Sequence, residues 1–80
     1  MIQNVEIAYE DTAPAYERES LFAKSLQMWL RPFSEEINRQ NGKLVLVFCK
    51  DGSNKFRLEN VDEELRNRIA EQFPKFVSHS

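Results

Sequence analysis

The stretch 43-KLVLVFCKDGSNKFRLE-59 decides the fold of this chain. Two runs of strand-forming residues flank Asp51–Asn54, whose residue types are those of a tight turn. In the second run, Phe56 and Leu58 alternate with charged residues, so one face of that strand is apolar and the other is polar. The stretch therefore predicts a β-hairpin over residues 43–59.

The first strand of this hairpin is apolar on both of its faces. One face carries a leucine–phenylalanine set, Leu44, Leu46 and Phe48, and the other carries a valine–cysteine set, Val45, Val47 and Cys49. Such a strand is covered on both sides in a folded protein. An odd number of loop residues places Phe56 and Leu58 beside the first set, and an even number places them beside the second. Either register leaves three apolar side chains on a face with polar flanks.

The segment from Tyr16 to Gln40 has helical periodicity. Its apolar residues fall on one side of a helix, and we expect them in the core: Phe22, Leu26, Trp29, Leu30, Phe33 and Ile37. Asp11–Pro14 is typical of a helix entrance, and Asn41-Gly42 of a helix end. Pro32 interrupts the segment, which predicts either one kinked helix or two helices with Pro32 starting the second.

A further helix is expected after the hairpin. Asn60 and Glu63 have the spacing of a capping box, which places the start of this helix at Asn60. Its apolar stripe is Val61, Leu65, Ile69, Phe73 and Phe76. Pro74 ends or bends it near Phe73. We expect the chain beyond Pro74 to fray, above all residues 78–80, although Phe76 and Val77 are apolar enough to pack back.

Together these elements predict one small α+β domain spanning residues 1–80, with two layers. An antiparallel sheet of two or three strands packs against two helices. Residues 2–10 alternate in their second half and predict an additional first strand, but the pattern is short. The element order is therefore β-α-β-β-α, or α-β-β-α if that strand does not form.

Composition and residue types point away from catalysis. The chain has one cysteine and one histidine, Cys49 and His79, and a cysteine nucleophile needs a base held beside it. We expect Cys49 to fill the core and His79 to lie in the terminal tail. No cluster of metal ligands and no glycine-rich phosphate loop is recognisable, so we expect no enzyme activity, no metal and no cofactor. The lone thiol, and an N-terminus without a signal-peptide pattern, favour the cytoplasm. The longest apolar run, Leu44–Cys49, is too short to span a membrane.

These observations favour a non-catalytic protein-binding domain, regulatory or adaptor-like, whose partner is another protein or a second copy of the chain. The apolar residues left over for such a surface are Leu21, Met28, Leu44, Leu46 and Phe48. If the interrupted helix covers both faces of the sheet instead, the domain is complete alone. A second hypothesis is nucleic-acid binding by the basic hairpin residues Lys43, Lys50, Lys55, Phe56 and Arg57. The net charge of −2 opposes it.

Overall fold

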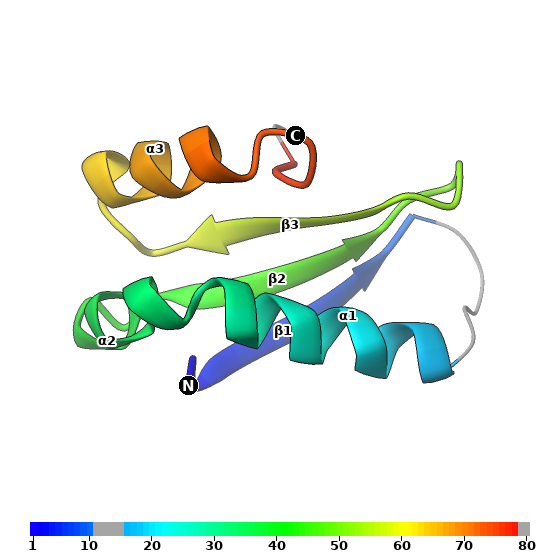
Figure 1. Cartoon of the computed structure of the whole chain (residues 1–80), viewed down its shortest axis with the longest axis horizontal. Helices are drawn as coiled ribbons and strands as arrows, with labels where there is room; N and C mark the ends of the chain where they lie inside the picture. Colours follow the sequence, from blue (N-terminus) through cyan, green and yellow to red (C-terminus); the bar gives the residue numbers. More distant parts are fainter. Residues whose placement is uncertain (11–15, 79–80) are drawn as a thin grey trace.

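The computed structural model describes residues 1–10 and 16–78, with the side chains of the first helix described from Leu21 onward. Its elements, in chain order, are β1 (Asn4–Tyr9), α1 (Tyr16–Trp29), α2 (Arg31–Arg39), β2 (Lys43–Phe48), β3 (Asn54–Glu59) and α3 (Glu63–Gln72). The fold is the predicted small α+β domain, and residues 2–10 do contribute a strand (Figure 1). The expected helix entrance at Asp11–Pro14 lies outside the described residues.

The three strands form a mixed sheet in the order β1-β2-β3. β2 and β3 are antiparallel, as expected for a hairpin. β1 is parallel to β2, so the prediction of a purely antiparallel sheet was wrong. The physical reason is the connection between β1 and β2. The two helices α1 and α2 carry the chain back along the sheet, and β2 then starts beside the start of β1 (Figure 1).

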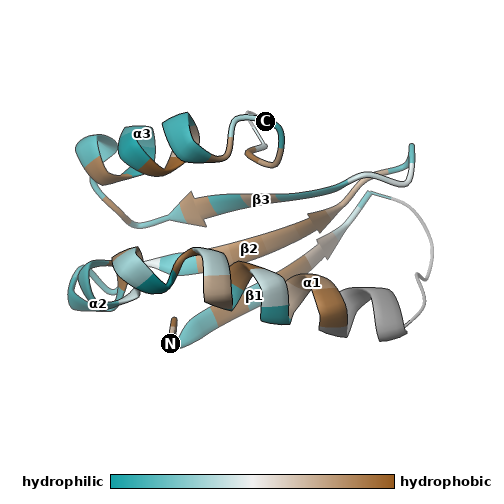
Figure 2. Ribbon diagram, in the orientation of Figure 1, coloured by the Kyte–Doolittle hydropathy of each residue, from teal (hydrophilic) through white to brown (hydrophobic). Residues whose placement is uncertain are grey.

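The hairpin register determines which residues face the helices. Phe48 pairs with Asn54, so five residues, 49–53, form the loop. This odd number places Phe56 and Leu58 on the same face as the leucine–phenylalanine set. That face meets all three helices in one core, whose members are Ile2, Phe22, Leu26, Leu30, Ile37, Leu44, Leu46, Phe48, Phe56, Leu58, Val61, Leu65 and Ile69. In Figure 2, β2 is apolar along most of its length, whereas α2 and α3 are largely hydrophilic.

The long helical segment is divided into two helices. Leu30 separates α1 from α2, and its backbone is hydrogen-bonded to both helices. Its N–H donates to the Leu26 carbonyl at 2.8 Å, and its carbonyl accepts from the Phe33 N–H at 2.9 Å. Pro32 lies in the first turn of α2, where a missing N–H costs no helical hydrogen bond. The second of the two predicted arrangements is therefore the observed one.

The end of α2 is closed by Asn41-Gly42, as the sequence predicts. Asn41 adopts a left-handed conformation with φ 59°. Its N–H donates to the Asn38 carbonyl at 3.0 Å, and the Gly42 N–H donates to the Ile37 carbonyl at 2.8 Å. These are the two hydrogen bonds of a Schellman motif. The motif turns the chain directly into β2.

The start of α3 differs from the expected one. The helix begins at Glu63, and its N-cap is Asp62, whose carboxylate accepts from the Leu65 N–H at 2.8 Å. Asn60 lies two residues earlier with φ 63° and donates its side-chain amide to the Asn41 carbonyl at 3.0 Å. Asn60 and Glu63 therefore form no capping box. Asn60 instead ties the chain before α3 to the end of α2.

The chain after α3 returns to the sheet. α3 ends at Gln72, before Pro74, and the following segment runs along the outer edge of β3 (Figure 1). The Phe56 N–H donates to the Phe76 carbonyl at 2.7 Å, and the Ser78 N–H donates to the Phe56 carbonyl at 2.8 Å. Phe76 and Val77 thus pack back, and Ser78 is ordered by the sheet. The expected fraying of residues 79–80 and the position of His79 lie outside the described residues. Among the described helices, none is long and apolar enough to cross a bilayer.

Candidate functional site

The strongest candidate surface is the outer edge of β1. Among the described residues, this strand is paired with β2 only. The Glu10 N–H donates to the Phe48 carbonyl at 3.0 Å, so the even-numbered residues here direct their backbone groups toward β2. Because backbone groups alternate along a strand, the N–H and C=O of Val5 and Ile7 point away from the sheet. β1 therefore offers backbone donors and acceptors in strand geometry.

Apolar side chains accompany these backbone groups. Val5, Ile7 and Tyr9 are 43%, 42% and 46% exposed. Their register opposite the leucine–phenylalanine set places them on the helix-covered face of the sheet, where the Tyr9 ring stacks on Phe48 with centroids 5.6 Å apart. The helices bury the β2 residues of this face but leave the edge partly uncovered. We call Val5, Ile7 and Tyr9, with the outward backbone groups of Val5 and Ile7, the β1 edge.

Two side-chain amides fix the chain just before this edge. The Gln27 carbonyl oxygen accepts from the Ile2 N–H at 2.9 Å, and its NH₂ donates to the Ile2 carbonyl at 3.2 Å. Asn38 does the same for the neighbouring residues, accepting from the Gln3 N–H at 3.0 Å and donating to the Met1 carbonyl at 2.8 Å. The Ile2 side chain is buried in the core. The start of β1 is thus held to α1 and α2 on its helix side, and this anchoring does not use the outer edge.

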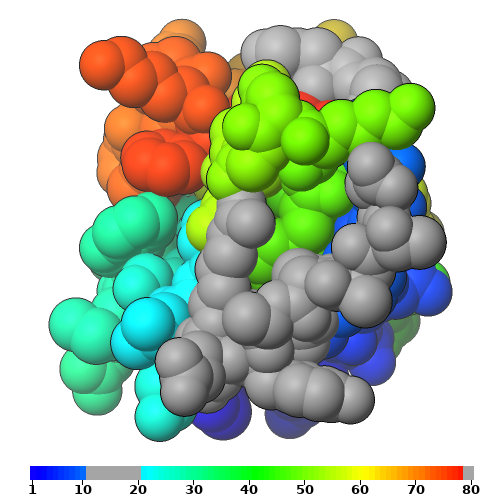
Figure 3. Space-filling view, turned by 90° about the vertical axis from the view of Figure 1, so that its right-hand side faces the viewer, coloured from blue at the N-terminus to red at the C-terminus, as the bar shows by residue number. Residues whose placement is uncertain are grey.

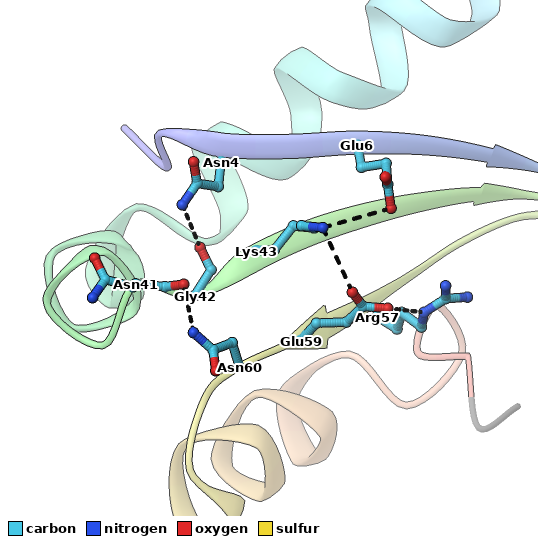
Figure 4. A network of polar contacts seen from close by, with 8 residues as sticks. All are labelled: Asn4, Glu6, Asn41, Gly42, Lys43, Arg57, Glu59 and Asn60. Carbon is cyan, nitrogen blue, oxygen red and sulfur yellow. Dashed lines mark hydrogen bonds and ion pairs between the residues drawn. The ribbon is translucent and has the colours of Figure 1, made fainter.

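The opposite face of the sheet is closed by charged residues. Val45 is fully buried although it lies outside the core that the described helices share with the sheet, and the register sets Glu6 and Arg57 on either side of it. The Lys43 ammonium lies 4.0 Å from the Glu6 carboxylate and 3.9 Å from that of Glu59 (Figure 4). Arg57 reaches the same Glu59 carboxylate at 3.1 Å. Long charged side chains cover apolar surface with their alkyl stems while their heads remain in water.

Most of the partner surface proposed from the sequence is not on the surface. Leu44, Leu46 and Phe48 are at most 4% exposed and belong to the core, because the helices cover this set and the charged stems cover the other. Leu21 and Met28 are indeed exposed, at 67% and 73%. The five residues therefore do not form one patch, and the expectation of a surplus apolar face on β2 was wrong.

The alternative nucleic-acid surface is also dispersed. Phe56 is 1% exposed and packs in the core, so it cannot stack on a base. Lys43 and Arg57 lie beside carboxylates on the sheet face. Lys50 and Lys55 remain near the hairpin turn, where the Lys50 backbone N–H donates to the Glu10 carboxylate at 3.2 Å. An aromatic platform flanked by free cations is therefore not formed by these residues.

Trp29 lies at the seam between α1 and the C-terminal segment, and not in the centre of the core as expected. It is 40% exposed, and its ring lies 6.1 Å from that of Phe73 and 5.4 Å from that of Phe76. In Figure 3 the C-terminal segment (red) lies against this part of the helices (teal). The buried residues Phe22, Leu26, Leu30 and Ile37 keep one helical phase across the break, and Trp29 lies at the margin of their arc.

The remaining polar features offer no catalytic arrangement within the described residues. Cys49 is a free, half-buried thiol at the start of the turn. Among the described residues, no three or more metal-binding side chains lie close enough together to hold an ion. Asp51 accepts from the Ser53 hydroxyl at 2.6 Å and from the Ser53 N–H at 2.9 Å, which lowers the pKa of this carboxyl. These bonds shape the turn.

A groove of about 440 Å³ follows the outer edge of β3, between this strand, α3 and the C-terminal segment. Its charged side chains already have partners. Arg57 is paired with Glu59, and the Arg66 guanidinium donates to the Val61 carbonyl at 3.4 Å. The charged groups that line the groove are therefore already engaged, and the β1 edge remains the better candidate.

No family model, curated protein or solved structure matches this chain.

Proposed function

We propose that this chain is a non-catalytic protein-binding domain, regulatory or adaptor-like, that takes an extended segment of its partner as an additional strand on the β1 edge. One observation carries the proposal. The outward N–H and C=O groups of Val5 and Ile7 lie beside three apolar side chains that are each more than 40% exposed. Addition of a strand to a sheet edge uses such backbone groups for affinity and the neighbouring side chains for specificity. The single free thiol agrees with action in the cytoplasm.

The contrast between the two edges of the sheet supports this proposal. The outer edge of β3 is occupied by the chain's own C-terminal segment, through both backbone groups of Phe56. β1 has six residues and contains no proline and no lysine, two residues that commonly protect an edge strand, and its one charged residue, Glu6, lies on the face opposite its apolar side chains. The apolar face of this edge therefore carries no proline and no charge, and it is suited to pairing with another strand.

The geometry also limits the sequence of the partner. Every second side chain of an added strand would lie beside Val5, Ile7 and Tyr9 on the helix side, and the others would lie beside Glu6 on the charged face. The favoured partner segment therefore alternates apolar and polar residues. Its apolar residues are β-branched or aromatic, because these make the most favourable cross-strand pairs.

The direct test uses peptides and amide-resolved NMR. An eight-residue peptide that alternates valine or isoleucine with threonine should slow hydrogen exchange at the Val5 and Ile7 amides, whereas a scrambled peptide of the same composition should not. The variant Ile7→Lys should lose this protection. The matched variant Leu21→Lys, which introduces the same charge at a residue 67% exposed on α1, should retain it. Absence of protection by any alternating peptide would contradict the proposal.

The same protein preparation tests the nucleic-acid alternative. The triple variant Lys50→Glu, Lys55→Glu and Arg57→Glu removes three of the hairpin cations. Because Arg57 pairs with Glu59 at 3.1 Å, circular dichroism must first show that the variant is folded. We expect the wild-type chain not to bind a short single-stranded oligonucleotide even at low salt. Micromolar affinity at physiological salt, lost in the triple variant, would instead assign the function to the hairpin.

A further inference from the structure

We infer that residues 74–78, the strap, make an autoinhibitory contact with the outer edge of β3. The strap opens from this edge while the rest of the domain stays folded, and in its closed position it keeps a partner strand off the edge. The opening of the strap is independent of the proposed function. The ligand that it excludes, an extended partner segment like the one assigned to the β1 edge, rests on that proposal.

The strap is fastened to β3 through the backbone of Phe56. The Phe56 N–H donates to the Phe76 carbonyl at 2.7 Å, and the Phe56 carbonyl accepts from the Ser78 N–H at 2.8 Å. These bonds form an isolated parallel bridge that pairs Phe56 with Val77. β3 itself is paired with β2 along all six of its residues. Two hydrogen bonds at one point break at a much lower cost than the ladder that holds β3 in the sheet.

The side chains of the strap are at most partly buried. Phe76 and Val77 pack at the margin of the core, and the Phe76 ring lies 5.4 Å from that of the half-exposed Trp29. Pro74 and Lys75 are exposed. Each of the three helices, in contrast, has at least one completely buried aliphatic side chain: Leu26, Ile37, Leu65 and Ile69. Opening of the strap therefore exposes much less apolar surface than detachment of any helix would.

Pro74 separates the strap from α3. The Phe73 N–H still donates to the Ile69 carbonyl at 3.1 Å, as in the last turn of a helix. Pro74 has no N–H, so the helical hydrogen bonding cannot continue through it. The Phe76 N–H then donates to the Phe73 carbonyl at 3.1 Å and closes a turn. The strap can therefore swing away at this turn without unwinding α3.

The open strap uncovers an edge that fits an extended partner segment. Because backbone groups alternate along a strand, the N–H and C=O of Leu58 point outward like those of Phe56. Within the described part of the chain, these Leu58 groups have no hydrogen-bond partner, and Leu58 lines the groove that runs from the strap along β3. The strap itself sets a β-branched residue, Val77, beside the aromatic Phe56, which is a favourable pair on neighbouring strands. It thus occupies the position that a partner strand would take.

Amide hydrogen exchange tests whether the strap opens alone. The Phe56 N–H is held by the strap, whereas the Arg57 N–H faces Val45 in the β2–β3 ladder. The protection factor of the Phe56 amide should therefore be lower than that of the Arg57 amide by about 100-fold or more. Ser78→Pro removes one fastening N–H and should lower Phe56 protection by a further factor of about 10, with Arg57 unchanged and Ser78→Ala as the control. Equal protection of the two amides in the wild-type chain would overturn the inference.

The alternating valine–threonine peptide tests the autoinhibitory role. The double variant Phe76→Ala, Ser78→Pro removes both the ring contact with Trp29 and one fastening hydrogen bond. In this variant the peptide should slow exchange at the Phe56 and Leu58 amides. In the wild-type chain the same peptide concentration should leave both amides unchanged. Retained protection of amides in the β2–β3 ladder, read from the same spectra, shows that the variant is folded.

The two sheet edges are read separately in this experiment. Protection of Val5 and Ile7 without Phe56 and Leu58 in the double variant would overturn the autoinhibitory role of the strap and leave the proposed function intact. Protection of Phe56 and Leu58 without Val5 and Ile7 would support the strap and overturn the β1 edge as the binding site. Protection at neither edge would overturn both.

Discussion

Replacement of Gly42 by alanine tests the junction at which α2 passes into β2. Gly42 is buried, and its N–H donates to the Ile37 carbonyl at 2.8 Å. A Cβ atom at this position would lie 2.5 Å from Val61 Cγ1, 2.8 Å from Ile37 Cγ2 and 3.0 Å from the Ile37 carbonyl oxygen. Three elements therefore meet at a point where only a hydrogen fits.

The cost follows from these distances. Carbon atoms pack best at about 3.5–4.0 Å, so the new methyl group would be about 1 Å too close to two side chains. Both neighbours are β-branched and have few alternative rotamers, and the third contact is backbone. The structure can relax only by moving α2, β2 or the segment before α3. We expect Gly42→Ala to lower the free energy of unfolding by about 2–3 kcal/mol. For a domain of this size that corresponds to a Tm lower by about 10–20 °C.

Urea unfolding followed by circular dichroism measures this cost, and a double-mutant cycle identifies its source. Val61→Ala removes the closest clashing atom, so the double variant should be less destabilised than the sum of the single variants by about 1 kcal/mol. Gly52→Ala is the control, because no atom lies within 4 Å of its Cβ and its cost of about 1–2 kcal/mol arises from φ +88°. The free-energy costs of Val61→Ala and Gly52→Ala should simply add in the double variant. A Gly42→Ala variant within 0.5 kcal/mol of wild type would refute the reasoning.

The other predictions concern single side chains. Asp62→Ala should cost about 1 kcal/mol in urea unfolding, because it removes the N-cap of α3. Trp29→Ala should cost about 2 kcal/mol, less than a fully buried tryptophan, because the ring is 40% exposed; a loss above about 4 kcal/mol would place it in the core. Cys49→Ala should cost less than about 1 kcal/mol and preserve peptide protection, and loss of binding in the folded variant would contradict a structural role. The pKa of Asp51, followed by NMR, should lie below 3.8 and rise in Ser53→Ala, because the hydroxyl stabilises the carboxylate. Its contribution to stability is present above the pKa of the unfolded chain and is lost as the pH falls through the lowered pKa. An unchanged pKa in Ser53→Ala would contradict this cause.

Patterns that depend on near neighbours were predictable from the sequence. The hairpin over residues 43–59 followed from alternation and turn residues, and the end of α2 followed from Asn41-Gly42. Both are decided within a few residues by backbone preferences that the side chains impose. Pro32 could be placed near a helix start for the same reason, since its missing N–H is tolerated there.

Features decided by distant parts of the chain were not predictable in the same way. Asn60 and Asp62 are both good N-cap residues by type. The structure selects Asp62 because Asn60 is engaged by the Asn41 carbonyl across 19 positions of sequence. Trp29 lies at the margin of the helical stripe, and the returning C-terminal segment packs Phe73 and Phe76 against it there, so that it lies at a seam. In each case a tertiary contact overrides a sound local preference.

The candidate site was missed because position within the sheet, and not composition, determines exposure. A strand apolar on both faces, such as β2, indicates that both faces are covered, but the alkyl stems of lysine, arginine and glutamate can supply that cover. Val5, Ile7 and Tyr9 already form one apolar face in the sequence. Their exposure depends on β1 lying at an edge, and that follows from the parallel crossover through α1 and α2. β3 pairs along one side of β2 and β1 along the other, so the two sheet edges are the outer edges of β1 and β3. The C-terminal segment occupies the outer edge of β3. Among the residues that the structure describes, the edge left to a partner is therefore that of β1.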